Sequence, residues 1–182
     1  MDSHHGGGMD SEVLRNSPMF DGLSDADLDR LLTLFERKKF PPLSTIFLEN
    51  MPGNSIFLLE KGLVKITKIR EEFDIDQEEE TTRDVPAGLS RGVERVLVHL
   101  RQGEFFGEMS FIDGQPRSAS AFAVEESDVL VLEKSAFDRL AREDTALAFR
   151  LAINMARILS SRLRQTDQLL VGLTEMIYQC RT

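Results

Sequence analysis

The sequence predicts a mainly β domain, an antiparallel sandwich or jelly roll, with a short helix before it and a long helix after it. Between Phe40 and Glu133 the chain consists of short runs rich in Val, Ile, Phe and Thr, which Gly and Pro interrupt. Outside this region, apolar residues recur at helical spacing. Many short strands joined by tight turns are typical of an antiparallel sandwich or jelly roll.

The chain starts with a segment that we do not expect to fold. Met1 to Gly8 contains two histidines and three consecutive glycines, so we expect residues 1–10 to be a disordered extension or a tag remnant. Ser24 and Asp27 form a capping box with Asp in place of Glu, and apolar residues follow at helical spacing. This pattern predicts a short helix over residues 25–36.

Six segments have the composition of strands, and turn residues such as those of 51–54 separate them. They are residues 45–49, 55–60, 63–69, 95–100, 118–124 and 128–132. Residues 71–93 have neither a strand nor a helix pattern, so we expect a long mobile loop there. We therefore expect residues 11–143 to form the β domain, with the acidic loop 71–93 inside it.

The C-terminal part is expected to be helical, with residues 144–182 forming a long final helix. Ser135 and Asp138 open a first helix, and Asp144 or Thr145 caps a longer one that runs to about Tyr178. Its apolar seam has the spacing of a coiled coil; the seam residues are Ala156, Leu159, Leu163, Thr166, Leu170, Leu173 and Ile177. The seam packs either on the β domain or on a second chain. A helix of ~50 Å overhangs a small β domain, which favours a homodimer through residues 152–177.

Composition and charge exclude several classes of protein. The 182 residues carry a net charge of −9, and eight acidic residues against one arginine lie between Glu71 and Asp84. This balance repels a phosphate backbone, so we expect no direct binding to nucleic acid. No apolar stretch approaches the ~20 residues of a membrane span, and the single Cys180 suits a reducing compartment. We expect a soluble, cytoplasmic protein that does not bind membranes.

Enzymatic chemistry finds little support in the residue types present. A metal-dependent cupin shares the jelly-roll form, but its site needs clustered imidazoles, and His99 is the only histidine outside the first residues. Cys180 stands at the end of the chain with no histidine nearby in sequence. We therefore predict a protein that is not an enzyme and holds no metal.

The segment 103–121, GEFFGEMSFIDGQPRSASA, carries the most informative residues. Gly107 lets the backbone approach a ligand closely, and a short helix from Glu108 onward directs free N–H groups at an anion. Arg117 supplies a planar fork of donors for phosphate oxygens, whereas an ionised Glu108 accepts from a hydroxyl. An acid and an arginine in this arrangement fit a ligand that has an anion beside a sugar.

This segment resembles the phosphate-binding cassette of cyclic-nucleotide-binding domains, the family of catabolite activator proteins and of regulatory subunits of cyclic-AMP-dependent protein kinase. The resemblance covers roughly residues 17–170, and its matching elements are Phe106-Gly107-Glu108-Met109-Ser110, Gly114 and Pro116-Arg117-Ser118-Ala119. It implies an eight-stranded jelly roll (double-stranded β-helix). Leu43-Ser44-Thr45 replaces a glycine common in the family, and the acidic insertion is longer than usual. Activator proteins continue into a helix-turn-helix domain, whereas this chain ends at Thr182, so DNA binding is not carried over.

The resemblance implies a non-catalytic sensor that passes its signal to the long helix. The ligand is cyclic AMP or cyclic GMP, and Ser118, where Thr often accompanies guanine, favours cyclic AMP. Arg117, Ser118 and Ala119 then contact the phosphate, Glu108 the ribose 2′-OH, and Arg162 stacks on or hydrogen-bonds the purine. The full set of expected ligand-binding residues is Phe106, Gly107, Glu108, Met109, Ser110, Arg117, Ser118, Ala119 and Arg162.

Other interpretations of the same residues remain open. Glu108 and Arg117 form an ion pair across an empty loop in a degenerate domain that binds no nucleotide and acts as a protein-interaction module. Ser118 is then an ordinary strand residue and Arg162 a solvated arginine. A further alternative is that the chain is the sensor fragment of a transcription regulator.

Overall fold

The computed structural model describes residues 15–71 and 92–179 of the chain. The expected disordered extension (residues 1–10), Cys180 and most of the acidic segment 71–93 lie outside the described residues. The described chain divides into two compact units, of which one lies within residues 37–130. The other combines the two ends of the chain, up to residue 36 and from residue 131.

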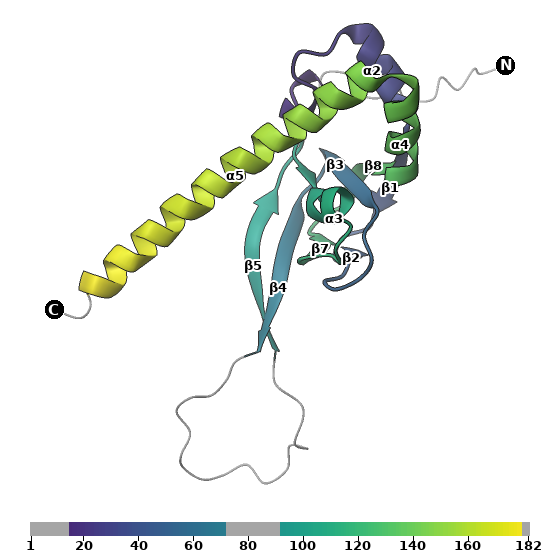
Figure 1. Cartoon of the computed structure of the whole chain (residues 1–182). Helices are drawn as coiled ribbons and strands as arrows, with labels where there is room; N and C mark the ends of the chain where they lie inside the picture. The colour runs from purple at the N-terminus through teal and green to yellow at the C-terminus, as the bar shows by residue number, and fades with distance from the viewer. Residues whose placement is uncertain (1–14, 72–91, 180–182) are drawn as a thin grey trace. The chain divides into compact units, whose positions relative to one another are not determined.

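Strands and one short helix occupy the middle of the chain, and the other helices lie toward its two ends (Figure 1). In chain order the elements are η1 (Pro18–Phe20), α2 (Asp25–Leu32), β1 (Phe35–Phe40), β2 (Thr45–Phe47), β3 (Ser55–Lys61), β4 (Val64–Glu71), β5 (Gly92–Leu100), β6 (Phe105–Phe106), α3 (Glu108–Asp113), β7 (Ser120–Ala123), β8 (Ser127–Glu133), α4 (Lys134–Glu143) and α5 (Thr145–Gln179). The mainly β prediction, with a short helix before the strands and a long one after them, is confirmed.

Two four-stranded sheets make up the jelly roll, with the strand orders β1-β8-β3-β6 and β2-β7-β4-β5. In the first sheet β6 pairs antiparallel with β3, and Phe106 lies opposite Phe57. In the second sheet β4 pairs with β7 over residues 64–67 and with β5 over its full length. β4 and β5 therefore form a long antiparallel ribbon, which Figure 1 shows.

The core of the strand unit is built around β3. Its residues from Ser55 to Glu60 are all buried, because Ile56-Phe57-Leu58-Leu59 is an uninterrupted apolar run that suits a strand covered on both faces. Large fully buried side chains from other strands, Val64, Phe105 and Leu130, complete the core. A strand fixed in this way holds its first residue, Ser55, in a defined position.

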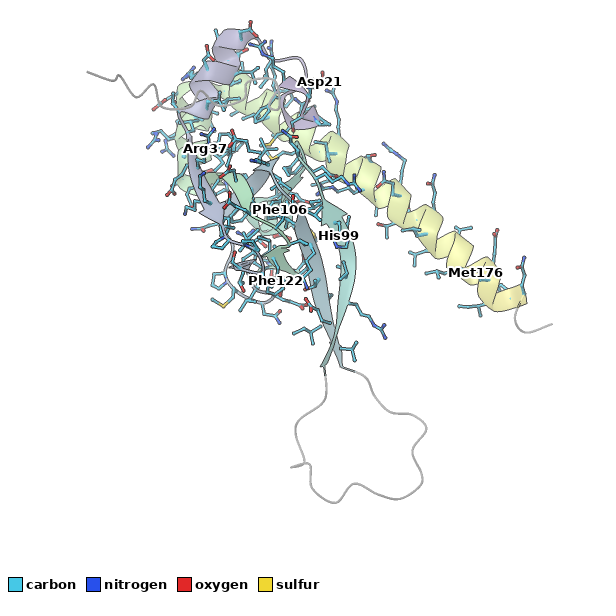
Figure 2. The ribbon with its side chains drawn as sticks, turned by 180° about the vertical axis from the view of Figure 1, so that it is seen from behind. Asp21, Arg37, His99, Phe106, Phe122 and Met176 are labelled. Atoms are coloured by element: carbon cyan, nitrogen blue, oxygen red, sulfur yellow. The ribbon has the colours of Figure 1, made fainter. Side chains whose placement is uncertain are left out.

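The helical unit joins the two ends of the chain through packing and hydrogen bonds. Met19, Leu31, Leu140 and Leu151 are all buried, with at most 2% of their surface exposed. The side-chain amide of Asn154, in α5, donates to the carbonyl oxygens of Met19 at 3.2 Å and of Asp21 at 2.9 Å (Asp21 is labelled in Figure 2). The start of the last helix is thus tied to the segment around η1.

α5 is an unbroken helix of 35 residues, which is about 52 Å at 1.5 Å per residue. The carboxylate of Asp144, one of the two caps that the sequence predicts, accepts from the N–H of Leu147 at 3.0 Å. Leu163, Leu170, Leu173 and Ile177 of the predicted seam are 52–62% exposed. Met176, labelled near the helix end in Figure 2, is 56% exposed. Among the described residues, no helix is both long enough and apolar enough to cross a membrane.

The prediction of a helix over residues 25–36 is wrong at its C-terminal end. The helix, α2, ends at Leu32, and Phe35 opens β1 instead. The sequence of β1, FERKKF, lacks the composition of a strand, but pairing with β8 satisfies its backbone. Acidic partners from the same unit neutralise its cations, because Arg37 pairs with Glu60 and Lys39 with Asp128.

The predicted strand boundaries need smaller corrections. β2 ends at Phe47 rather than at residue 49, β7 spans Ser120–Ala123 rather than 118–124, and β6 was not predicted. The segment 71–93 is not wholly a loop, because Glu71 ends β4 and Gly92 begins β5. α4 begins at Lys134, one residue before the predicted Ser135, because the extended Glu133 is its N-cap.

Candidate ligand-binding site

Two glycines delimit the short helix at the centre of the candidate site. Gly107 precedes α3 with φ 78°, and Gly114 follows it with φ 70°, and both lie in the left-handed region that side chains disfavour. A β-carbon at Gly107 would also lie 2.7 Å from Nη1 of Arg117. Glycine is therefore required at position 107 for the turn and for the approach of the arginine.

Arg117 is buried, with 4% of its surface exposed, and its guanidinium is held from several directions. Nη1 donates to the carbonyl oxygen of Gly107 at 2.8 Å, and Nη2 donates to the hydroxyl oxygen of Ser55 at 3.0 Å. The guanidinium carbon lies 4.4 Å from the ring centroid of Phe47 and 5.3 Å from that of Phe57. Aromatic faces stabilise a cation at such distances.

The aromatic wall beside Arg117 comes from three strands. Phe47 of β2, Phe57 of β3 and Phe106 of β6 pack with ring centroids 5.2 to 6.0 Å apart. Phe106 and Phe57 lie opposite each other in the sheet, and their rings are stacked with an interplanar angle of 18° (Phe106 is labelled in Figure 2). This cluster gives the arginine a rigid apolar support.

The backbone of Arg117 is fixed by the loop between β2 and β3. Its N–H donates to the carbonyl oxygen of Met51 at 2.8 Å, and its own carbonyl oxygen accepts from the N–H of Asn50 at 2.9 Å. Asn50 has φ 65°, a left-handed conformation that asparagine tolerates better than most residues do. Residues outside the 103–121 segment therefore hold the backbone of Arg117 and contribute, together with Gly107, to the position of its guanidinium.

The structure brings several of the predicted site residues together. Gly107 contacts Arg117, and the hydroxyl of Ser118 donates to the sulfur of Met109 at 3.4 Å. Glu108 (6% exposed), Ser110 (3%) and Ala119 (7%) are buried, while Ser118 is exposed. Arg162 lies in α5 and belongs to the helical unit, so its contact with a ligand stays a prediction.

Sequence reasoning missed three contributors from the β2–β3 region. Arg117 is contacted or closely approached by Phe47, Gly53 and Ser55, each of which lies at least 62 positions before it in the chain. The sequence indicates a turn at residues 51–54, but turn residues are common and do not by themselves indicate a site. No local pattern connects these residues to the arginine.

Buried guanidinium donors next to a glycine turn suit the oxygens of a phosphate. Within the described residues, no group of three or more His, Cys, Asp or Glu side chains is placed to hold a metal ion. The site offers a cation, hydroxyl groups, a buried carboxyl and an aromatic wall. Such an inventory matches a small ligand with both a phosphate and polar sugar groups.

Comparisons with known proteins agree with this chemistry. The sequence model of the family described as "Cyclic nucleotide-binding domain" matches residues 87–144. The chain is 32% identical over 154 residues to the Cyclic AMP receptor protein of Thermus thermophilus, and the alignment covers 85% of this chain and 61% of that protein. It is 32% identical over 132 residues to a cAMP-dependent protein kinase regulatory subunit of Colletotrichum orbiculare, covering 72% of this chain and 28% of that protein.

A solved structure supports the same relationship at the level of the fold. A cyclic nucleotide-binding domain from Methylobacillus flagellatus superposes with a TM-score of 0.68 at 25% identity, covering 87% of this chain and 79% of that one. The chain spans less than two thirds of the length of each of the two curated relatives named in the paragraph above. The matched segment contains Gly107, Glu108 and Arg117. Residues 87–144 of this protein thus belong to the cyclic-nucleotide-binding domain family, and the likeness to the named relatives extends over 72–87% of the chain.

Proposed function

We propose that the chain is a non-catalytic sensor that binds a cyclic nucleotide, with cyclic AMP preferred over cyclic GMP. The observation that carries the proposal is the position of Arg117, buried against the Gly107 turn with its guanidinium on Phe47. Its Nη atoms donate to the neutral oxygens of Gly107 and Ser55. Phosphate oxygens are stronger acceptors than either of these, so a phosphate readily takes their place.

The other predicted residues complete the proposed ligand contacts. Glu108, at the start of α3, accepts from the ribose 2′-OH, and Ser118 with the N–H of Ala119 contacts the phosphate. Arg162 of α5 contacts the purine. The names of the relatives, a cyclic AMP receptor and a cAMP-dependent kinase regulatory subunit, support cyclic AMP as the ligand.

Calorimetric titration with cyclic AMP and with cyclic GMP tests this proposal. Arg117→Ala removes a buried, hydrogen-bonded cation, and such a loss costs about 2–5 kcal/mol, or roughly 30- to several-thousand-fold in affinity. Arg101→Ala is the matched control, since Arg101 is an exposed arginine in the same unit. Wild-type protein that binds neither nucleotide would support a protein-interaction module instead. Unchanged tight binding by Arg117→Ala would show that the site is wrongly assigned.

We propose that α5 both dimerises and receives the signal. Its exposed seam residues support pairing with a second copy through residues 152–177. A ligand shifts the helix only by the difference in its affinity for two arrangements, which is typically ~1–3 kcal/mol. Hydrogen exchange with and without cyclic AMP tests the signal. Protection that does not change beyond residue 140 would contradict it.

A further inference from the structure

Gly53, in the loop between β2 and β3, lies against the middle of the Arg117 side chain. A β-carbon added at Gly53 would be 2.4 Å from Nε of Arg117 and 2.7 Å from its Cδ and Cζ atoms. These distances are all below the 3.0 Å that β-carbons respect in proteins. Any side chain at position 53 therefore requires Arg117 or the loop to move.

Arg117 has little freedom to make that movement while keeping its contacts. The hydrogen bonds from the guanidinium to Gly107 and Ser55, and its stacking on Phe47 at 4.4 Å, fix the far end of the side chain. The backbone hydrogen bonds described above fix the near end. A shift of Nε and Cζ by the ångström or so that a β-carbon demands breaks the guanidinium contacts.

Gly53 differs from Gly107 in the reason for which it is glycine. Gly107 has φ 78°, so an alanine there is strained by its backbone as well as by its contact with Nη1. Gly53 is not among the residues with positive φ, so its backbone accepts alanine without that strain. Substitution of Gly53 therefore tests the contact with Arg117 without the backbone strain that a change at Gly107 would add.

We infer that Gly53 is a positioning residue, whose missing side chain keeps the Arg117 guanidinium where it meets the phosphate of the ligand. This inference rests on the proposed function for its ligand. It adds a residue outside the 103–121 segment to the determinants of affinity. It also means that the position of the Arg117 guanidinium depends on the absence of a side chain at position 53 of the β2–β3 loop.

A double-mutant cycle on ligand-free protein tests the contact without any nucleotide. Gly53→Ala lowers the melting temperature Tm by roughly 3–10 °C, as overpacking does in a chain of this size. In the Arg117→Ala background the same change shifts Tm much less, because the space is vacated. Asn54→Ala, at the exposed neighbouring residue, is the control and leaves Tm nearly unchanged. Equal losses of Tm in both backgrounds would overturn the inference.

A spectroscopic measurement separates positioning from general destabilisation. The Nε–H resonance of Arg117 is assigned by its disappearance in Arg117→Ala. Because the guanidinium carbon lies 4.4 Å from the Phe47 ring centroid, the chemical shift of this resonance should depend on the position of the side chain. Gly53→Ala moves this resonance, whereas Asn54→Ala leaves it in place. A resonance that stays unmoved in Gly53→Ala would contradict the inference.

Titration with cyclic AMP then connects the position to binding. The Kd for Gly53→Ala rises about tenfold or more, since a displaced charge loses its ligand contacts, while that of Asn54→Ala stays within about twofold. If the wild type binds cyclic AMP tightly, an unchanged affinity in Gly53→Ala would overturn the inference. If the wild type binds no nucleotide, the proposed function fails, and the cycle and the resonance alone decide whether Gly53 positions Arg117.

Discussion

The hydroxyl of Ser118 donates a hydrogen bond to the sulfur of Met109, with the oxygen and sulfur atoms 3.4 Å apart. Ser118 is exposed and Met109 is 51% exposed, so this contact lies at the surface of the candidate site. A thioether is a weak acceptor. In the proposed complex we therefore expect a phosphate oxygen beside Arg117 to displace this contact at little cost.

Ser118→Ala is expected to weaken the binding of cyclic AMP only modestly. A neutral hydrogen bond contributes about 0.5–1.5 kcal/mol, which corresponds to roughly 2- to 12-fold in Kd by calorimetry. Met109→Leu, which keeps the volume and removes the sulfur, leaves the Kd within about twofold. If Ser118→Ala lost as much affinity for cyclic AMP as Arg117→Ala, the assignment of the main phosphate contact to Arg117 would be wrong.

Glu108→Gln is expected to change how the protein distinguishes cyclic AMP from its 2′-deoxy analogue. A hydrogen bond to a charged group contributes about 1.5–3 kcal/mol, so the wild type prefers the ribose compound roughly 10- to 150-fold. In Glu108→Gln this preference shrinks, because a neutral amide oxygen accepts more weakly. Glu104→Gln, at an exposed acid of the same segment, keeps the wild-type ratio. An equal ratio in wild type and Glu108→Gln would mean that Glu108 does not contact the hydroxyl.

Local pattern was enough to predict the elements whose own residues determine them. The apolar run of β3 predicts a buried strand, and the spacing of apolar residues in α5 predicts a helix, each from local sequence alone. The charged β1 and the two-residue β6 were missed because pairing with β8 and β3 stabilises them, and sequence pattern does not reveal such partners.

The same distinction applies to the site. Gly107, Glu108 and Arg117 stand within eleven positions of one another, so their spacing predicts a shared role. The hydrogen bond between Arg117 and Ser55 joins residues 62 positions apart. Ser55 begins β3, and β3 pairs with β6, the strand that precedes Gly107. Local sequence pattern does not reveal this pairing.

Disruption of the α5 seam is expected to dissociate a dimer. Leu170→Glu places a charge in the predicted seam, at a residue that is 56% exposed in the single chain. Val171→Glu is the matched control, since Val171 has 58% exposure but points away from the seam. Sedimentation velocity should show association weakened by roughly 30-fold or more in Leu170→Glu, as for a central interface residue. Equal effects of both variants would remove the seam as the interface.

The capping box of α2 predicts a pH dependence of stability in the helical unit. The hydroxyl of Ser24 donates to the carboxylate of Asp27 at 2.7 Å, and the Ser24 N–H donates to it at 3.1 Å. These two hydrogen bonds, of which the side-chain bond has the larger effect, hold the pKa of Asp27 below its ordinary value of 3.8.

A folded pKa below the unfolded one stabilises the folded state above pH 3.8, and this contribution is lost as the pH falls through the folded pKa. Denaturant unfolding should therefore show Asp27→Asn less stable than wild type at pH 7, with a difference in unfolding free energy that narrows as the pH falls below 3.8. Asp29→Asn, at an exposed acid of the same helix, should show no such narrowing. A gap between wild type and Asp27→Asn that is constant across this range would mean that the carboxylate does not cap the helix in solution.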